Sequence, residues 1–240
     1  MIDFSNIRGF LFDYGGTIDS NGIHWAEIIW QAYQLEKVPV SKETFRSAYI
    51  YGERTLGKTP IIKPHHTFLD MMRLKIDIQF EWLVAEKQFS ENGNITMWKR
   101  NVADFCYDYA RSSVEKARPI IGRIAEKYAL ALVSNFYGNI AAVLKDFQLD
   151  CFFPVIIESA VVGIRKPNPQ IFRLGVEALQ LSEKETVVVG DSYGKDIVPA
   201  ASIGCPTIWL KNTGWDEYTG NETADWIISD FAELGKVTHY

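Results

Sequence analysis

Short runs of apolar residues recur along the chain, and most of them are separated by segments with helical spacing. Six runs have the length of a strand and are rich in Val, Ile, Leu or Phe: 7–12, 129–133, 153–157, 186–189, 206–210 and 226–228. A continuous apolar run suits a strand of a parallel sheet that is covered on both faces. Strands that alternate with helices are typical of α/β proteins. We therefore expect a parallel α/β sheet as the core.

The stretch 20–115 has a different character, with many aromatic and long polar side chains. Apolar residues with helical spacing occur at 25–35, 44–51, 67–76 and 95–111. The segment 52–66 contains two glycines and two prolines, which predicts a loop between helices. We expect a mostly helical domain, residues 20–115, inserted into a core built from residues 1–19 and 116–240.

Composition and charge limit the kinds of molecule that the protein is expected to bind. The chain has 240 residues, of which 47% are hydrophobic, enough for a sizeable buried core. Its net charge is −5 and it has no block of Lys and Arg, which argues against a nucleic-acid surface. A small, anionic metabolite is the expected partner. The sequence does not indicate an oligomeric state.

The start of the chain lacks a basic leader followed by a long apolar stretch, and nowhere do 18 apolar residues run together. We therefore expect a cytoplasmic protein without a membrane partner. Cys106, Cys151 and Cys205 are odd in number and widely spaced, so neither a disulfide framework nor a zinc site is expected. Buried thiols are the simplest expectation for them.

Polar residues follow three of the apolar runs. Asp13 comes directly after the first run, Ser134 and Asn135 follow 129–133, and Asp191 comes one glycine after 186–189. Ligands of open parallel sheets bind at the carboxyl ends of the strands. We therefore expect these side chains to share one site.

The residue types suit phosphoryl chemistry. A carboxylate such as Asp13 can attack phosphorus, and Thr17 could donate a hydrogen bond to the phosphoryl group. Ser134 and Asn135 could bind a phosphoryl oxygen, and Lys166, within the proline-stiffened segment 163–169, could neutralise the group. Each feature also has a plain structural explanation, since Asp, Gly, Ser and Asn form turns and most lysines are solvated.

The loop 190–196 carries Asp191 and, five residues on, Asp196. Carboxylates at the start of such a loop are ligands that Mg²⁺ accepts alongside a substrate phosphate. Alternatively, Asp191 or Ser192 caps a helix and Asp196 interacts with its dipole. Both explanations remain open at this point.

Four segments, Asp-Tyr-Gly-Gly-Thr at 13–17, Leu-Val-Ser-Asn at 132–135, Lys-Pro-Asn-Pro at 166–169 and Gly-Asp-Ser-Tyr-Gly-Lys-Asp at 190–196, occur in this order. Together they resemble the haloacid dehalogenase superfamily of aspartate-nucleophile phosphotransferases. The resemblance implies a Rossmann-like core with a helical cap between the first two motifs. It also implies Mg²⁺ held by Asp13, the backbone carbonyl of Gly15 and Asp191. Asp196 would lie behind these ligands or pair with Lys166.

One position departs from the family pattern. Most phosphatases of the family have a second aspartate two residues after the nucleophile, and this chain has Gly15 there. That aspartate protonates the leaving oxygen and later activates water, a contribution of roughly a hundred- to ten-thousand-fold. The resemblance therefore implies a magnesium-dependent hydrolase of a small phosphorylated metabolite, acting through an aspartyl phosphate on Asp13 with Lys166 as the neutralising cation.

Several alternatives stay open. Asp19 or His24 could replace the missing acid, although a capping or hinge role suits Asp19 better. The protein could be a catalytically reduced module that binds magnesium and a ligand. Phosphonate hydrolysis would use a cap lysine, for which Lys75 is a candidate, although a helical lysine is usually solvated. A 2-haloacid dehalogenase would also lack the second aspartate, but retention of Asp191 argues for a metal.

Substrate choice is expected to reside in the inserted domain. Its aromatic and basic side chains include Trp25, Trp30, Tyr33, Tyr49, Tyr51, Arg54, Lys58, His65, His66 and Trp82. An aromatic face with helical spacing is usually domain core, so most of these are expected to be buried packing residues. Arg54 and Lys58 could reach a second anionic group of a substrate, or lie on a solvated face.

Overall fold

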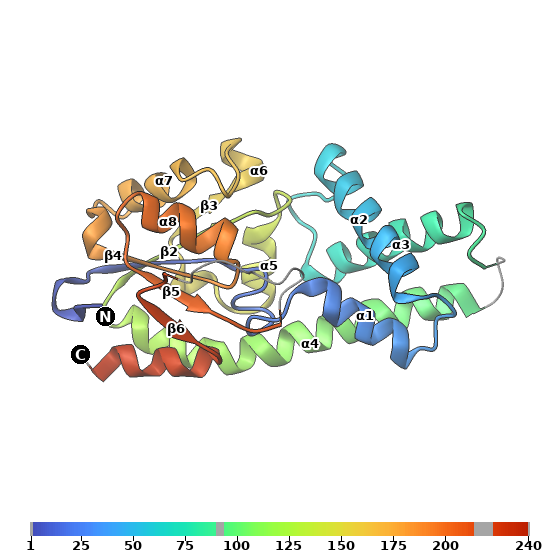
Figure 1. The fold of residues 1–240 in the computed structure, drawn as a ribbon, viewed down its shortest axis with the longest axis horizontal. Coiled ribbons are helices and arrows are strands. Elements are labelled where there is room, and N and C mark those ends of the chain that lie inside the picture. The colour runs from blue at the N-terminus through green and yellow to red at the C-terminus, as the bar shows by residue number, and fades with distance from the viewer. Residues whose placement is uncertain (1, 90–93, 214–222, 240) are drawn as a thin grey trace.

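A six-stranded parallel sheet forms one half of the computed structural model, which describes residues 2–89, 94–213 and 223–239 (Figure 1). The strands are β1 (Gly9–Phe12), β2 (Ala129–Ser134), β3 (Val155–Glu158), β4 (Thr186–Gly190), β5 (Thr207–Leu210) and β6 (Trp226–Ile228). Their order in the sheet is β3-β2-β1-β4-β5-β6, and every neighbouring pair is parallel. The predicted α/β class and parallel sheet are confirmed, with one strand for each apolar run.

Helices cover both faces of this sheet. Phe10 and Phe12 point to the face covered by α4, α5 and η5, whereas Leu11 packs under α7 and α8. In Figure 1, α7 and α8 lie above the sheet and α4 lies below it. The covering elements are α4 (Asn94–Ala125), α5 (Ile140–Asp146), α6 (Ser159–Val162), α7 (Gln170–Ala178), α8 (Val198–Ser202) and the 3₁₀-helix η5 (Phe231–His239). Because both faces are buried, the strands are apolar at successive positions.

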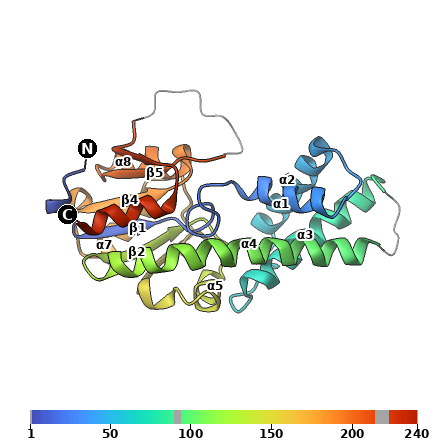
Figure 2. The same cartoon turned by 90° about the horizontal axis from the view of Figure 1, so that it is seen from below.

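The other half of the molecule is helical. It contains α1 (Trp25–Leu35), α2 (Lys42–Lys58), α3 (Phe68–Ala85) and the N-terminal part of α4 (Figure 2). The remaining short elements are the 3₁₀ turns η1 (Phe4–Asn6), η2 (Asp150–Phe152) and η3 (Glu183–Glu185) and the π-helical turn η4 (Tyr193–Ile197). No helix in the described part of the chain is long and apolar enough to cross a membrane. The division into a core and an inserted domain at residue 116 stays a prediction, because α4 runs through this residue without a break.

The helix α2 is longer than the sequence predicts. It continues through Gly52 and Gly57 to Lys58, so the expected loop starting at residue 52 is wrong over 52–58, which form about two helical turns. Gly52 faces α3, and a Cβ there would lie 3.4 Å from Cγ of Gln79. Glycine thus permits close packing of the two helices, which offsets its low helix propensity.

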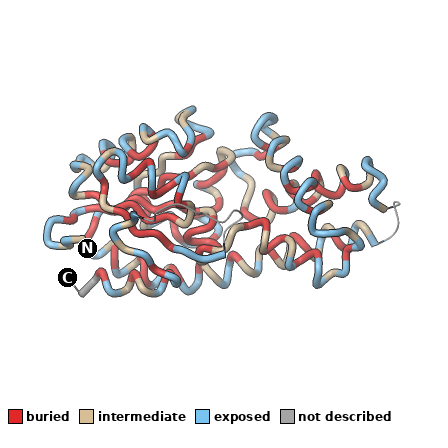
Figure 3. The backbone as a smooth tube through the Cα atoms, viewed as in Figure 1, coloured by how far each residue is buried: buried red, intermediate tan, exposed pale blue. Residues whose placement is uncertain are grey.

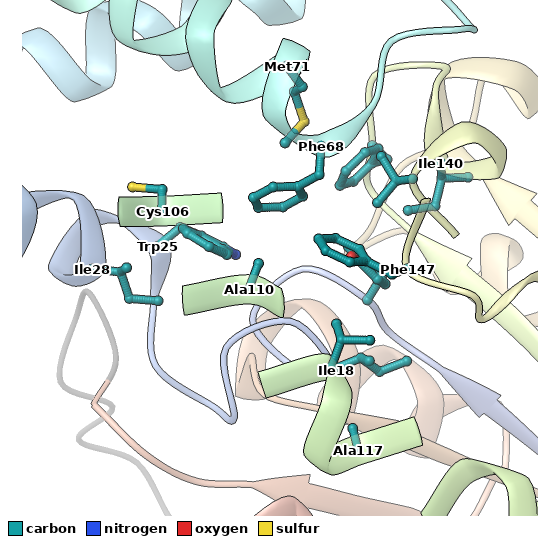
Figure 4. Close-up of a cluster of buried hydrophobic side chains, with 14 of the residues drawn as sticks. Ile18, Trp25, Ile28, Phe68, Met71, Cys106, Ala110, Ala117, Ile140 and Phe147 are labelled. Atoms are coloured by element: carbon teal, nitrogen blue, oxygen red, sulfur yellow. The ribbon is translucent and has the colours of Figure 1, made fainter. Parts of the chain in front are cut away.

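A single hydrophobic cluster joins the two halves. Trp25 packs on Phe68 with ring centroids 5.3 Å apart, and Phe68 packs on Phe147, after α5, at 5.5 Å. Cys106 and Ala117 of α4 belong to the same cluster (Figure 4). Figure 3 shows the buried backbone running continuously from the sheet into the helical half. The position of α1 and α3 relative to the core is therefore fixed by apolar packing.

The cysteines follow the expectation only in part. Cys106 and Cys205 are buried free thiols, as expected. Cys151 is exposed, so the expectation of a buried thiol is wrong there. It lies in the η2 turn, whose residues are not buried.

Candidate active site

The polar residues that end the central strands meet at one edge of the sheet. β1 pairs with β2 on one side and with β4 on the other, so Asp13, Ser134 and Asp191 emerge from three adjacent strands. The Asp13 amide donates a hydrogen bond to the carbonyl of Val189, at 2.9 Å, which extends the ladder by one residue. Chain segments more than 100 residues apart are brought together in this way, as the strand-end pattern predicts.

Lys166 forms the centre of a buried charge cluster. Its Nζ lies 2.6 Å from Oδ1 of Asp13 and 2.6 Å from Oδ1 of Asp196, and its side chain is only 2% exposed. Burial acts to lower the pKa of Lys166, but the carboxylates of Asp13 and Asp196 outweigh it and raise the pKa above its ordinary value. The amine is therefore a fixed cation beside Asp13.

Asn135 holds the segment that carries this lysine. Its Nδ2 donates to the carbonyl of Lys166 at 3.1 Å, and the Lys166 amide donates to its Oδ1 at 2.9 Å. Two reciprocal hydrogen bonds fix the loop after β2 against the loop before α7. The side chain that the sequence offered as a phosphate ligand thus positions the cation, while Asn135 also lines the cavity described below.

Two hydroxyl groups flank Asp13. Thr17 Oγ1 lies 3.2 Å from Oδ2 of Asp13 and 2.9 Å from Oδ1 of Asp191, and Ser134 Oγ lies 3.3 Å from Oδ1 of Asp13. Thr17 is fully buried and Ser134 is 2% exposed. Both hydroxyls are thus held within reach of a group bound to Asp13.

The carboxylates are arranged to accept a metal cation. Oxygens of Asp13, Asp191 and Asp196 lie within 4.8 Å of one another. Burial and then the charges of Asp13 and Asp196 raise the pKa of Asp191 well above its ordinary value. Asp196 uses Oδ1 for Lys166 and accepts the Ser192 amide on Oδ2 at 3.0 Å. This donor set fits a hard divalent ion such as Mg²⁺.

The two glycines after Tyr14 differ in what they tolerate. Gly16 has φ +101°, and a Cβ there would lie 2.5 Å from both carboxylate oxygens of Asp191. A side chain at this position would displace Asp191, so glycine is required. Gly15 lines the cavity, and a Cβ there would meet nothing within 4 Å. The missing aspartate of the family pattern is therefore not excluded by lack of space.

Asp19 has a local structural role. Its Oδ1 accepts the Gly16 amide at 2.7 Å and its Oδ2 accepts the indole N–H of Trp25 at 3.0 Å. It connects the loop after β1 to the first turn of α1, in agreement with a capping or hinge function. His24 caps α1 by accepting the Ala26 amide at 3.2 Å and also lines the cavity.

Replacing Asp19 with Asn should flatten the pH dependence of stability. Burial raises the pKa of Asp19 to about 7 from 3.8, so between these values the folded chain holds a proton that the unfolded chain has lost. The contribution of Asp19 to the free energy of unfolding is therefore fully present at low pH. It decreases as the pH rises towards 7, by up to about 4 kcal/mol in total. The measurement is urea unfolding of parent and variant at several pH values from 4 to 8. Asp150→Asn on the surface is the control. If the free energy of unfolding changed equally with pH in the parent and in Asp19→Asn, the prediction would be wrong.

Two adjoining cavities lie beside these residues. The first, of about 200 Å³, is lined by Asp13, Gly15, Lys166 and Asp191. The second, of about 130 Å³, lies under α2 and α3 and is lined by apolar side chains including Phe68, and by Lys75. Both share Gly15, His24, Glu53 and Tyr137. Asp13 therefore lines a small cavity that shares part of its wall with the second one.

Three residues of this space were missed or misjudged from the sequence. Lys75, expected to be solvated, is 5% exposed and pairs with Glu53 at 2.7 Å, whereas neither Glu53 nor Tyr137 was singled out. Arg54 and Lys58 are both exposed, which agrees with the possibility that they lie on a solvated face. Helical spacing offered one signal, because Lys75 lies four residues after the buried Met71 on the same stripe of α3.

Comparison with known proteins agrees with this geometry. A glyceraldehyde 3-phosphate phosphatase from Pyrococcus furiosus is 33% identical over 178 residues, covering 72% of this chain and 69% of that protein. A phosphoglycolate phosphatase from Yersinia pestis is 24% identical over 244 residues, covering 98% and 94%. The solved structure of the HAD-hydrolase YfnB from Bacillus subtilis shares the fold, with TM-score 0.62 and 18% identity over 98% of this chain and 99% of that one. The family model for haloacid dehalogenase-like hydrolases matches residues 7–204, which include all four motifs, and the chain therefore belongs to that family of hydrolases.

Proposed function

We propose that the protein is a magnesium-dependent phosphatase of small phosphorylated metabolites and that Asp13 is its nucleophile. The observation that carries the proposal is the setting of the Asp13 carboxylate. It lies between the Lys166 ammonium and the hydroxyls of Thr17 and Ser134, at the mouth of a small cavity. Two relatives are named for phosphatase activity on small phosphate esters, which supports the same substrate class.

In the first step an oxygen of Asp13 attacks phosphorus, the bond from phosphorus to the ester oxygen breaks, and an aspartyl phosphate forms. Lys166, Thr17 and Ser134 position the phosphoryl group and stabilise its charge. In the second step water attacks phosphorus, the bond to Asp13 breaks, and inorganic phosphate leaves. Asp13, Asp191 and the Gly15 carbonyl would hold Mg²⁺, which supplies further charge neutralisation when bound.

The described site lacks an evident proton donor for the leaving oxygen. Gly15 offers no proton. Asp19, whose oxygens accept the Gly16 amide and the Trp25 indole N–H, lines the second cavity and not the first, which Asp13 lines. The proposed activity therefore favours leaving groups that need little protonation, such as acyl or aryl oxygens. The same observation carries a second candidate, a module that binds magnesium and a phosphate ligand with little or no turnover.

Phosphonate hydrolysis through a Schiff base fits less well. A lysine that attacks a carbonyl must lose its proton. Burial acts to lower the pKa of Lys75, but Glu53 outweighs it and raises the pKa well above the ordinary value. Lys75 is thus held as a cation. Asp191 is retained beside Asp13, which supports metal-assisted phosphoryl transfer over dehalogenation.

The test is phosphate release with Mg²⁺ from acetyl phosphate, p-nitrophenyl phosphate and small alkyl phosphates. We expect release that falls roughly 10³-fold in EDTA and returns on adding Mg²⁺, because metal stabilisation of the transition state is worth several kcal/mol. Phosphonoacetaldehyde and 2-chloropropionate are the comparison compounds for phosphonate cleavage and halide release. Magnesium binding without release from any ester would favour the binding module, and metal-independent halide release would overturn the proposal.

A further inference from the structure

Glu53, Lys75 and Tyr137 form a polar group in the second cavity. Nζ of Lys75 on α3 lies 2.7 Å from Oε1 of Glu53 on α2. The Tyr137 hydroxyl donates to Oε2 of Glu53 at 2.8 Å, and its ring lies 5.2 Å from Nζ of Lys75. Tyr137 follows the Ser134-Asn135 motif in the same loop. The group thus spans from the helical half to the catalytic edge of the sheet.

This polar group has no net charge. Burial acts to raise the pKa of Glu53, but Lys75 and the hydrogen bond from Tyr137 outweigh it, so the pKa lies below its ordinary value. The corresponding balance keeps Lys75 protonated. A carboxylate and an ammonium therefore compensate each other. Trp25, Phe68 and Met71 add no charge to the wall of this cavity. Asp19 and Asp191 also line it, and neither can supply a positive charge.

The pair keeps capacity for one further polar partner. Oε1 of Glu53 is buried and, although close to Nζ, accepts no aligned hydrogen bond from the described residues. The ammonium of Lys75 has three N–H donors, and its ion pair with Oε1 of Glu53, at 2.7 Å, holds it in place. A hydroxyl group can donate to Glu53 and accept from Lys75 together. It would satisfy both groups without separating the ion pair.

A substrate carboxylate would interact with the Glu53–Lys75 pair less favourably than a hydroxyl group. It would compete with Glu53 for Lys75 and bring a second negative charge beside Glu53. An unpaired charge in a buried space is costly, because its lost hydration is not replaced. The compensated pair therefore disfavours an anionic distal group and favours a neutral, hydrogen-bonding one.

We propose that Glu53 and Lys75 select phosphate esters of small neutral hydroxylated compounds over esters that carry a carboxylate. This inference rests on the proposed phosphatase function and deepens it. Glu53 lines both cavities, so a phosphoryl group at Asp13 and a short hydroxylated chain at Glu53 would share one continuous space. Tyr137 holds Glu53 in place and acts as a positioning residue.

The test compares glycerol 3-phosphate with 3-phosphoglycerate, which differ in a hydroxymethyl group and a carboxylate. We expect the parent to prefer glycerol 3-phosphate in kcat/KM by at least about tenfold. Glu53→Gln keeps the side-chain shape and leaves the Lys75 cation uncompensated, so the preference should shift towards 3-phosphoglycerate by at least about tenfold. Glu43→Gln, on the exposed face of α2, is the matched control and should leave the ratio unchanged.

The outcomes separate the two proposals. Absence of release from every phosphate ester, including acetyl phosphate, contradicts the phosphatase function itself. Release from both glycerol esters with equal kcat/KM, or a parent preference for 3-phosphoglycerate, overturns the selectivity alone. The parent comparison decides this even if Glu53→Gln does not fold. With a folded variant, an unchanged ratio would also refute the assignment.

Discussion

Asp13→Asn is expected to reduce phosphate release by on the order of 10⁶-fold, the size of loss seen when a covalent nucleophile is removed. The amide has the shape of the carboxylate but is far less nucleophilic. Lys166 keeps its partner Asp196 at 2.6 Å, so no buried charge is left alone and the fold should survive. The measurement is steady-state phosphate release with Mg²⁺, together with thermal unfolding to confirm an intact protein.

Rapid quenching with a radiolabelled ester adds a direct readout. The parent should carry acid-stable label that Asp13→Asn lacks, because the intermediate forms on that carboxylate. Asp150→Asn, on the surface, is the matched control and should behave as the parent. Comparable phosphate release by Asp13→Asn and the parent would mean that water attacks the ester directly, and the nucleophile assignment would be wrong.

Gly15→Asp is expected to raise phosphate release from alkyl esters by roughly 10²- to 10⁴-fold, the contribution of a positioned general acid. A Cβ at Gly15 would meet nothing within 4 Å, and Gly15 lines the cavity, so the start of a side chain is accommodated there. The gain should be smaller for p-nitrophenyl and acetyl phosphate, whose leaving oxygens need little protonation. The measurement is kcat/KM against the pKa of the leaving group.

Gly15→Asn separates proton donation from changes of shape. It fills the same space without an acid, so it should stay near the parent value on every ester. If Gly15→Asp gave no advantage over Gly15→Asn on alkyl esters, the parent would already have an acid elsewhere. If the parent released no phosphate and Gly15→Asp did, the parent would have an intact phosphate site that lacks a proton donor.

The fold was predictable where local pattern and tertiary environment agree. All six strands coincide with apolar runs, because a sheet covered on both faces needs apolar residues at successive positions. The end of α2 was not predictable in this way. Gly52 weakens a helix locally but is placed there for the contact with α3, and a contact between helices leaves no mark in local propensity.

The site shows the same contrast. Asp13, Ser134 and Asp191 follow apolar runs, and the geometry of a parallel sheet brings such positions together. The roles assigned to them remain predictions. The pairing of Lys75 with Glu53 joins two helices. Helical spacing places Lys75 on the buried stripe of α3, but nothing in either segment alone identifies its partner on the other helix. Residues that shape the substrate end of the cavity therefore became visible only from the structure.

Because α4 is unbroken, it restricts where residues can be inserted into or deleted from this chain. The helix begins in the helical half at Asn94 and ends beneath the sheet at Ala125, with Pro119 inside it. Inserting or deleting one residue between these ends would turn everything on one side by about 100° around the helix axis. Glu53 and Lys75 would then no longer face Asp13. Viable length variants should thus differ near α4 by whole turns or lie in the connecting loops.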